Sequence, residues 1–341
     1  MKNLHKALAI AVHAASILAA PFAAAQEIDW DKDDTTYEAP GARDAVPKLP
    51  PVPDVKSAIP EKPWTIKHWD DGYHKPLEQL PVPDTNVKNV VTEENPLKVD
   101  VFYSMRSPYS YLALYRLAYL HSHYNVDVNI RVIFPIAVRT RSDDGSAGGL
   151  TGRWYYFPYS MIDMPRVGRY QGVPFRFANP DPILQDIYLP DGKATGAVAP
   201  MDKQPYISWL VRLANAAELQ GKGLEYCLAV SPLIWGARAP LGEWPLHVKD
   251  AVNSIGMDYD ATIKDIQENP EKYDAVWAKN AEDHAVTGQG GVPTFAFKEE
   301  PFFGQDRFNQ LFWRLRQNNL TVRKKPREPM VAKPLRWPAD D

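Results

Sequence analysis

The sequence predicts an α/β protein with an inserted helical region, preceded by a proline-rich arm. Residues 99–134 carry a strand, a helix and a second strand, and residues 206–284 show mainly helical spacing. Strand chemistry returns at residues 292–303, before a last helix. A chain of 341 residues with 45% hydrophobic residues is long enough to bury the core of such a fold.

The first α/β segment has two strand patterns that flank a helical one. Val99, Val101 and Tyr103 alternate with polar neighbours, and residues 126–132 repeat this period. Between them, residues 112–120 carry leucine and tyrosine at helical spacing. The order strand, helix, strand is that of a βαβ unit.

The turn of this unit reads Ser107-Pro108-Tyr109-Ser110. It places the Ser107 hydroxyl beside a helix N-terminus, where unpaired N–H groups and the positive end of the helix dipole favour an anion. The alternative is that Ser107 and Ser110 are ordinary turn and cap residues, because Ser-Pro commonly opens helices.

Charge and cysteine content narrow the function classes. The net charge of −3 and the pI near 6.3 leave no basic field for nucleic acid. The single cysteine, Cys227, excludes an internal disulfide and is expected in the core, with a reactive thiol as the alternative. His121, His123 and His284 do not have metal-site spacing, so no metal is expected.

The first 25 residues have the pattern of a secretory signal peptide. Lys2 and Lys6 precede an apolar run over residues 7–20, and a small-residue site predicts cleavage after Ala25. An uncleaved anchor is the alternative. No other stretch reaches the ~20 apolar residues that a membrane span requires. We therefore expect an exported protein, in the periplasm or secreted.

Residues 26–97 are expected to form an extended, proline-rich arm. Eleven of the 32 prolines lie between Pro40 and Pro96, and Pro-Val-Pro begins at both Pro51 and Pro81. Four aromatic residues give this arm more apolar surface than a solvated linker usually has: Trp30, Trp64, Trp69 and Tyr73. We expect part of it to pack on the domain, and docking of a protein partner is the alternative.

The middle of the chain, about residues 150–285, is expected to be a helical insert. Its periodicity predicts helices over residues 206–229, 245–255, 259–269 and 272–284. A strand over residues 292–297 and a short hairpin follow, and Asp306 is expected to cap the last helix. From residue 317 the tail is basic, proline-rich and expected to be loose.

Three segments in a fixed order carry a family resemblance. They read F-Y-S-M-R-S-P-Y-S-Y-L-A from Phe102, G-G-V-P-T-F-A-F from Gly290 and F-F-G-Q-D-R from Phe302. Over about residues 98–316 the chain resembles the DsbA-like superfamily, and within it the 2-hydroxychromene-2-carboxylate isomerases and kappa-class glutathione transferases. This resemblance implies a thioredoxin-like fold with a helical insertion domain.

The resemblance also implies a chemistry for the turn. Disulfide oxidoreductases of this fold have C-x-x-C there, whereas this chain has Ser107 and Ser110, which excludes thiol–disulfide exchange at the turn. In the isomerase and transferase branch the first serine hydrogen-bonds the sulfur of glutathione and favours its thiolate. Ser107 is therefore the implied catalytic residue, and glutathione the implied cofactor.

Two further segments match the glutathione-binding positions of this branch. Val292-Pro293 resembles its cis-proline turn, which leaves the Val292 backbone to pair with the γ-Glu-Cys part of glutathione. An ordinary edge-strand proline is the alternative. At the last helix, N–H groups near Gln305 and Asp306 would hold the γ-glutamyl carboxylate, and the Asp306 carboxylate would accept from its ammonium group.

Other positions complete the expected site. Tyr109, Tyr155 and Tyr156 could line an aromatic substrate pocket, although core packing is the commoner use of such residues. The Asn-Pro-Pro element of the isomerase branch is absent after the second strand. Arg139 or Arg141 could replace its basic contact to the glycine end of glutathione.

The sequence thus predicts an exported, glutathione-dependent isomerase-like or transferase-like enzyme that acts on a small aromatic-derived substrate. The kappa branch implies a homodimer. The alternative function is that of a periplasmic thioredoxin-fold binding or chaperone-like protein, redox-inactive because it lacks C-x-x-C.

Overall fold

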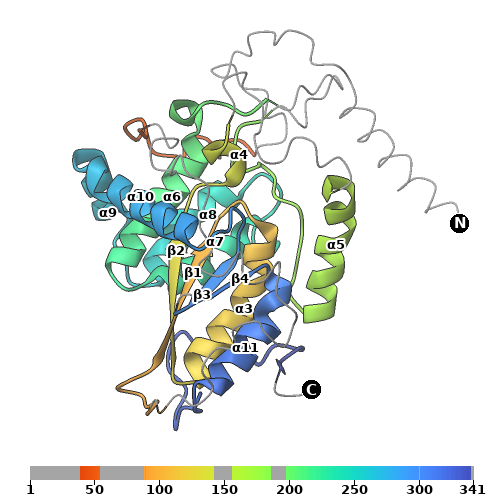
Figure 1. Cartoon of the computed structure of the whole chain (residues 1–341). Helices are drawn as coiled ribbons and strands as arrows, with labels where there is room; N and C mark the ends of the chain where they lie inside the picture. The colour runs from red at the N-terminus through yellow and green to blue at the C-terminus, as the bar shows by residue number, and fades with distance from the viewer. Residues whose placement is uncertain are drawn as a thin grey trace, which may run out of the picture.

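A four-stranded mixed sheet forms the centre of the molecule (Figure 1). The structure is a computed structural model that describes residues 39–53, 88, 90–141, 156–185, 197–298 and 300–338. The strands lie in the order β2-β1-β3-β4, with β1 at Leu97–Tyr103, β2 at Val126–Val132, β3 at Thr294–Phe297 and β4 at Glu300–Phe303. β1 pairs with β2 in parallel through α3 (Pro108–His123), which confirms the predicted βαβ unit, and β1–β3 and β3–β4 are antiparallel.

Side chains alternate between the two faces of the sheet, and different helices cover the two faces. Val99 and Val101 alternate with Asp100, which shares its face with Arg131 of β2. Figure 1 shows α3 and α11 (Phe308–Gln317) side by side on one face. On the other face, α10 (Pro270–Val286) packs through His284 against Phe102, with ring centroids 5.0 Å apart.

The helices between β2 and β3 gather beside the edge strand β2, apart from α5. They are α4 (Ile136–Arg139), α5 (Tyr156–Gln171), the 3-10 turn η4 (Met201–Lys203), α6 (Pro205–Leu219), α7 (Gly223–Ile234), α8 (Trp244–Ser254), α9 (Tyr259–Glu268) and α10 (Pro270–Val286). The prediction of one helix over residues 206–229 was wrong. The chain turns between α6 and α7 at Gly221, whose φ of 69° is easily reached only by glycine.

The core of this helical group is aromatic and contains the single cysteine. Trp209 and Trp244 are fully buried and stack with centroids 6.4 Å apart. Cys227 lies in α7 with no exposed surface, as predicted, and burial raises the pKa of its thiol. A buried thiol of this kind does not supply a reactive thiolate.

Part of the proline-rich arm packs on α6 and α10, as predicted. Arg212 of α6 has a fully buried side chain that donates to the carboxylate of Asp274 and to the backbone carbonyl of Pro50. Val52 is only 6% exposed. The expected signal peptide and the four arm aromatics lie outside the described residues. No helix in the described part is long and apolar enough to cross a membrane.

The C-terminal segment is packed over residues 318–338, so the prediction of a loose tail was wrong there. Trp337 is 3% exposed and donates from its indole nitrogen to the Tyr124 hydroxyl, 3.0 Å away. Its ring contacts aromatic side chains from α3, α11 and the loop after α3, namely Tyr119, Tyr124, Phe308 and Phe312. The helical pattern ends at Gln317, but an aromatic anchor 20 residues later holds the segment down.

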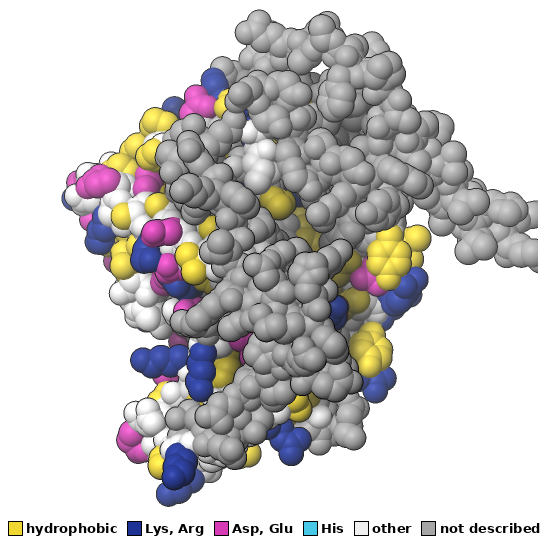
Figure 2. Space-filling view, in the orientation of Figure 1, with side chains coloured by type: hydrophobic (Ala, Val, Ile, Leu, Met, Phe, Trp, Pro, Cys, Tyr) yellow, Lys and Arg dark blue, Asp and Glu magenta, His cyan; other side chains and the backbone are white. Residues whose placement is uncertain are grey.

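Helix α5 lies to one side of the sheet and shows an apolar outer surface. Figure 2 shows hydrophobic and basic side chains next to one another over this helix. Tyr159, Ile162 and Tyr170 are each more than half exposed. Spacings of three and eight residues put them near one face of α5.

Candidate functional site at the N-terminus of α3

Ser107 caps α3. Its φ of −92° and ψ of 112° are extended, its Oγ accepts from the N–H of Ser110 at 3.2 Å, and Pro108 occupies the first helical turn. This is the geometry that an N-cap serine and an N1 proline favour. No acidic residue lies in the first turn, so nothing in that turn offsets the positive end of the helix dipole.

The Ser107 hydroxyl faces the loop before β3. Its Oγ donates to the carbonyl of Val292 at 3.3 Å, and the bond between Val292 and Pro293 is cis, as predicted. The carbonyl of Pro293 accepts from the N–H of Gly304 at 2.9 Å, which ties the start of the last helix to the same loop. The start of α3, the loop before β3 and the start of the last helix, which are far apart in the sequence, therefore meet next to Ser107.

Buried donors hold the remaining carbonyls of this loop. Arg139 donates to Gly290 at 3.0 Å, and Thr294 donates through Oγ1 to Gly291 at 2.8 Å. His284 Nε2 lies 2.9 Å from the same Gly291 carbonyl. Burial, and then the nearby Arg139, lower the pKa of His284 to about 3. The neutral ring therefore donates from Nε2, because the carbonyl can only accept.

The suggestion that Arg139 contacts the glycine end of a ligand was wrong. Its side chain is buried and donates to the carbonyls of Phe134 and Gly290. Burial lowers its pKa to about 10, so it remains cationic at neutral pH. Arg141 donates from Nε to the carbonyl of Val198, 2.8 Å away. Sequence reasoning missed the role of Arg139 because both of its partners are backbone carbonyls.

The start of the last helix differs from the prediction. Gln305 to Arg307 form a 3-10 turn and α11 begins at Phe308, so the N-cap is Arg307 and Asp306 caps nothing. The exposed Asp306 carboxylate pairs with Arg307 at 2.6 Å. In the described part of the chain, the N–H groups of Gln305 and Asp306 have no acceptor. They can therefore bind an anionic group, although Asp306 lies beside them.

Gly304 makes this turn possible. Its φ is 101°, and a Cβ at this position would lie 2.4 Å from Oδ1 of Asp306. The left-handed backbone therefore favours glycine, whereas the exposed carboxylate of Asp306 could move away from a Cβ.

The Gln305 side chain has a structural role that the sequence did not reveal. It is buried, its Oε1 accepts from Arg116 at 2.8 Å, and the amide of Gln171 lies 2.6 Å away. The Arg116 guanidinium also lies 4.8 Å over the ring of Phe308. Burial lowers the pKa of Arg116 to about 10. Arg116 also donates to the backbone carbonyl of Gln305, so the backbone N–H of Gln305 is the group that remains for a ligand.

Of the three tyrosines predicted to line an aromatic pocket, the structure describes the side chain of Tyr109 only. The Tyr109 hydroxyl donates to Asp163 of α5 at 2.8 Å, which ties the turn to that helix. Tyr155 lies outside the described residues, and Tyr156 begins α5 with a side chain that is not described. Another tyrosine of α3, Tyr111, donates from its hydroxyl to the carbonyl of Pro174 at 2.7 Å.

A bidentate ion pair next to Ser107 was also missed. Arg106 donates from Nε and Nη2 to the two carboxylate oxygens of Asp181, at 3.1 and 3.0 Å. Asp181 also accepts from the N–H of Ile183 and from Gln185. The pair fixes the turn to the segment before α6, and its partners are 75 residues apart, so no local pattern announces it.

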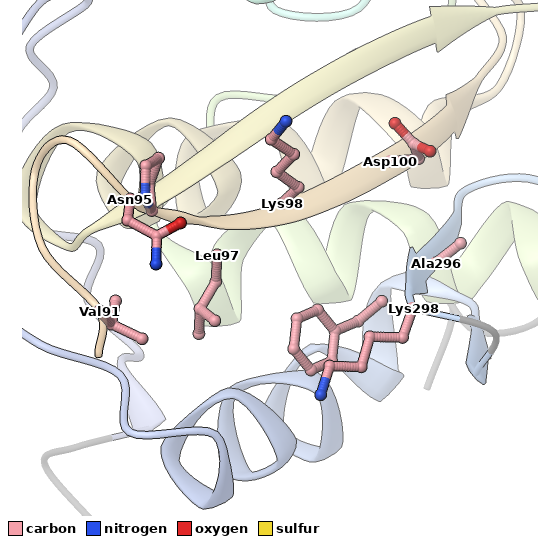
Figure 3. Close-up of a pocket in the computed structure, with 9 residues that line it drawn as sticks. Val91, Asn95, Leu97, Lys98, Asp100, Ala296 and Lys298 are labelled. Atoms are coloured by element: carbon pink, nitrogen blue, oxygen red, sulfur yellow. The ribbon is translucent and has the colours of Figure 1, made fainter. Parts of the chain in front are cut away.

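A cavity of about 360 Å³ lies at the opposite end of β1 from Ser107 (Figure 3). Its wall combines Val91, Leu97 and Phe297 with the charged residues Lys98 and Asp100. None of the predicted site residues lines it. The described residues contain no cluster of three or more His, Cys, Asp or Glu side chains that could hold a metal ion.

The chain belongs to the DSBA-like thioredoxin domain family, whose model matches residues 98–316. Its fold is the DsbA-like thioredoxin fold with a helical insertion, as the sequence predicted. No curated protein matches the chain.

Several solved structures are similar to this chain. A 2-hydroxychromene-2-carboxylate isomerase has 20% identity and a TM-score of 0.47, and the match covers 65% of this chain and 98% of that one. A probable DsbA oxidoreductase from Streptomyces coelicolor has 14% identity and a TM-score of 0.42, covering 70% and 94%. The cytosolic disulfide reductase DsbM from Pseudomonas aeruginosa with GSH has 18% identity and a TM-score of 0.39, covering 64% and 100%.

Proposed function

We propose that this protein is an exported, glutathione-dependent enzyme of the isomerase or transferase type, in which Ser107 stabilises the thiolate of bound glutathione. The contact between the Ser107 hydroxyl and the Val292 carbonyl, beside cis-Pro293 and at the start of α3, is the observation that carries this proposal. It brings a hydroxyl donor, a helix N-terminus and a backbone edge to one point.

The thiol has to come from a ligand. The turn has serine at both positions of C-x-x-C, and the single cysteine is buried in α7. A free thiol has a pKa of about 8.5, so only a few per cent is ionised at neutral pH. A hydroxyl donor and the dipole of α3 both favour the charged form. A decrease of one pKa unit corresponds to ~1.4 kcal/mol, which is within the reach of these two interactions.

Ser107 can make this donation by exchanging one acceptor for another. A hydroxyl has one proton to donate, and the donation to Val292 at 3.3 Å is long for an O–H···O bond. A thiolate bound at the N-terminus of α3 would take this proton as its hydrogen bond, while Ser107 Oγ continues to accept from Ser110. A charge-assisted bond of this kind is stronger than the bond it replaces.

The rest of glutathione would lie along Val292 and reach the 3-10 turn. The N–H of Val292 has no acceptor in the described part of the chain, so it can pair with the cysteinyl carbonyl of the peptide. The N–H groups of Gln305 and Asp306 would hold the γ-glutamyl carboxylate, and the exposed Asp306 carboxylate would hold its ammonium group.

The reaction we propose is addition and elimination. The thiolate adds to a conjugated double bond of an aromatic-derived substrate, and the π electrons move to the conjugated carbonyl. Rotation about the resulting single bond and loss of the thiolate restore the double bond in its other geometry. The thiolate leaves unchanged, so no oxidant or reductant is required. A transferase would instead keep the new S–C bond.

Calorimetric titration of the mature protein with reduced glutathione tests the proposal. We expect binding, and we expect Asp306→Ala to weaken it because the ammonium group loses its carboxylate. No heat up to millimolar glutathione would overturn the proposal. The second candidate, a redox-inactive peptide-binding protein, would then be favoured. Phe303 supports that candidate, because its 47% exposed ring lies where a Cβ on Gly291 would be, next to the Val292 backbone.

A further inference from the structure

The helical insert holds a proline-rich segment through a buried arginine. Arg212 donates from Nε and Nη2 to the two carboxylate oxygens of Asp274, at 2.9 and 2.7 Å. Its Nη1 donates to the carbonyl of Pro50, and Nη2 also lies 3.4 Å from the carbonyl of Pro51. A fully buried guanidinium has to satisfy its donors, so these carbonyls are part of the buried network.

Apolar and polar contacts extend along the same segment. Val52 is 6% exposed within the main core cluster, and Leu49 packs against that cluster. Gln267 of α9 donates to the carbonyl of Lys48 at 3.0 Å. We call the surface formed by Arg212, Asp274 and Gln267 the arm-binding surface. It spans α6, α9 and α10.

The segment is a good ligand because its conformation is restricted before it binds. Proline fixes φ, and a residue that precedes proline favours an extended backbone. Pro50, Pro51 and Pro53 therefore leave little freedom in residues 49–53. Such a segment loses little conformational entropy when it docks.

Part of this segment occurs twice in the chain, although Gln79 stands where Leu49 packs against the core. The tetrapeptide Pro51-Val52-Pro53-Asp54 recurs as Pro81-Val82-Pro83-Asp84. Aligning the two copies puts the carbonyl of Leu80 at the place of the Pro50 carbonyl. Arg212 contacts only backbone oxygens of the segment, so this difference in side chain does not remove its partner.

We propose that the arm-binding surface is a docking site for Pro-Val-Pro-Asp segments, and that its exchangeable occupant is the segment Pro81–Asp84 of a second copy of this chain. Residues 48–52 are the resident occupant. Because the resident is part of the same chain, it competes at an effective concentration of the order of millimolar. This inference does not depend on the proposed enzymatic function.

A labelled peptide of residues 78–87 tests the recognition. Val52→Asp puts a charge into the core position of the resident segment and should displace it. We expect the peptide to bind the folded chain that carries both Val52→Asp and Val82→Asp at least ~10-fold more tightly than the wild-type chain, because neither copy of the segment then competes. A peptide that carries Val82→Asp is the matched control and should not bind. Equal binding of the two peptides, or equal affinity of the two chains, would overturn the proposal.

The wild-type chain gives a second measurement if Val52→Asp does not fold. A photo-crosslinking group at position 82 of the peptide should label α6 or α10 when the peptide is in excess. Labelling elsewhere, or none, would contradict the proposal.

Sedimentation tests whether a second copy supplies the segment. At chain concentrations above the measured peptide Kd, Val52→Asp should self-associate, and Val52→Asp with Val82→Asp should remain monomeric. A monomeric Val52→Asp chain under these conditions would overturn the assignment of the occupant. Both proteins carry Val52→Asp, so a difference in their self-association is due to the segment around Val82 alone.

Discussion

The hydroxyl oxygen of Ser107 lies 3.3 Å from the carbonyl oxygen of Val292, a residue 185 positions later in the chain. This hydrogen bond joins the N-cap of α3 to the residue before cis-Pro293. It is a long, uncharged bond at a half-buried place, so it is easily exchanged for a bond to an anionic ligand.

Replacing Ser107 tests the use of this bond. Under the proposed function, Ser107→Ala should raise the pKa of the bound glutathione thiol by about one unit, which corresponds to ~1.4 kcal/mol. The dipole of α3 remains, so the pKa should stay below that of free glutathione. The ultraviolet absorbance of the thiolate as a function of pH measures this shift. An unchanged thiol pKa in the variant would rule out Ser107 as the activating group.

Ser110 provides the matched control at the other position of the turn. Its Oγ is fully buried and has no hydrogen-bond partner in the described part of the protein. Ser110→Ala removes only this unpaired hydroxyl, so it should leave the thiol pKa unchanged and alter the free energy of unfolding by less than ~1 kcal/mol.

Glu218 should make the folded state less stable at high pH. Burial raises its pKa to about 7, although Asn280 donates to its carboxylate at 2.8 Å. The native state therefore binds a proton that the unfolded state has lost between pH 4.5 and 7. Stability from this group is complete below pH 4.5 and is lost as the pH rises through 7. At pH 8, Glu218→Gln should raise the free energy of unfolding by ~1–3 kcal/mol.

Urea unfolding of Glu218→Gln at pH 4 and pH 8 checks this prediction, with the gain expected only at the higher pH. Glu268→Gln is the control, because Glu268 is 60% exposed and makes only a 3.9 Å surface pair with Lys264. Its effect should stay within ~0.5 kcal/mol at both values. A gain of the same size at pH 4 and pH 8 would show that ionisation of Glu218 is not the cause.

The sheet and its connections follow from local patterns in the sequence. The predicted alternation matches burial in β1 from Leu97 to Val101, and Pro293 stands where the cis bond occurs. Each of these signals lies within a few neighbouring residues. The division of residues 206–229 into α6 and α7 depends on one glycine at φ 69°, which periodicity cannot detect.

The hydrogen bonds that hold the candidate site in place could not be predicted, because they join residues that are far apart in the sequence. His284 and Arg139 reach the loop before β3 from α10 and α4, and Arg106 meets Asp181 from another segment. Asp306 is a residue type that favours the N-cap position, but it lies within a 3-10 turn and α11 begins only at Phe308. Pairings of this kind are set by packing rather than by spacing along the chain.

His284 should make stability fall at acidic pH. Its folded pKa of about 3 lies below the ordinary value of 6.5, so the unfolded state binds a proton that the native state excludes. Its contribution is complete above pH 6.5 and is lost as the pH falls towards 3, at up to ~1.4 kcal/mol per pH unit. The lowered pKa of His121 also reduces stability as the pH falls, whereas the raised pKa of Glu218 increases stability over the same change.

Comparison of wild type with His284→Gln isolates this contribution. Glutamine keeps a donor for the Gly291 carbonyl but takes up no proton. Both proteins retain His121 and Glu218, so these contributions cancel in the difference. Urea unfolding at several pH values between 4 and 7 should give a flatter profile for the variant, whatever its absolute stability. Parallel profiles would contradict a buried neutral His284.

Trp337 should anchor the C-terminal segment to α3 and α11. Its ring lies 4.7 Å from that of Tyr119 and 5.1 Å from that of Phe312, between centroids, and it is nearly fully buried. Trp337→Ala removes this ring and leaves a cavity, so the free energy of unfolding should fall by about 3–5 kcal/mol. Trp313 lies on α11 but is 53% exposed, so Trp313→Ala should change it by less than ~1 kcal/mol. Equal losses in the two variants, measured by urea unfolding, would mean that the segment does not depend on this anchor.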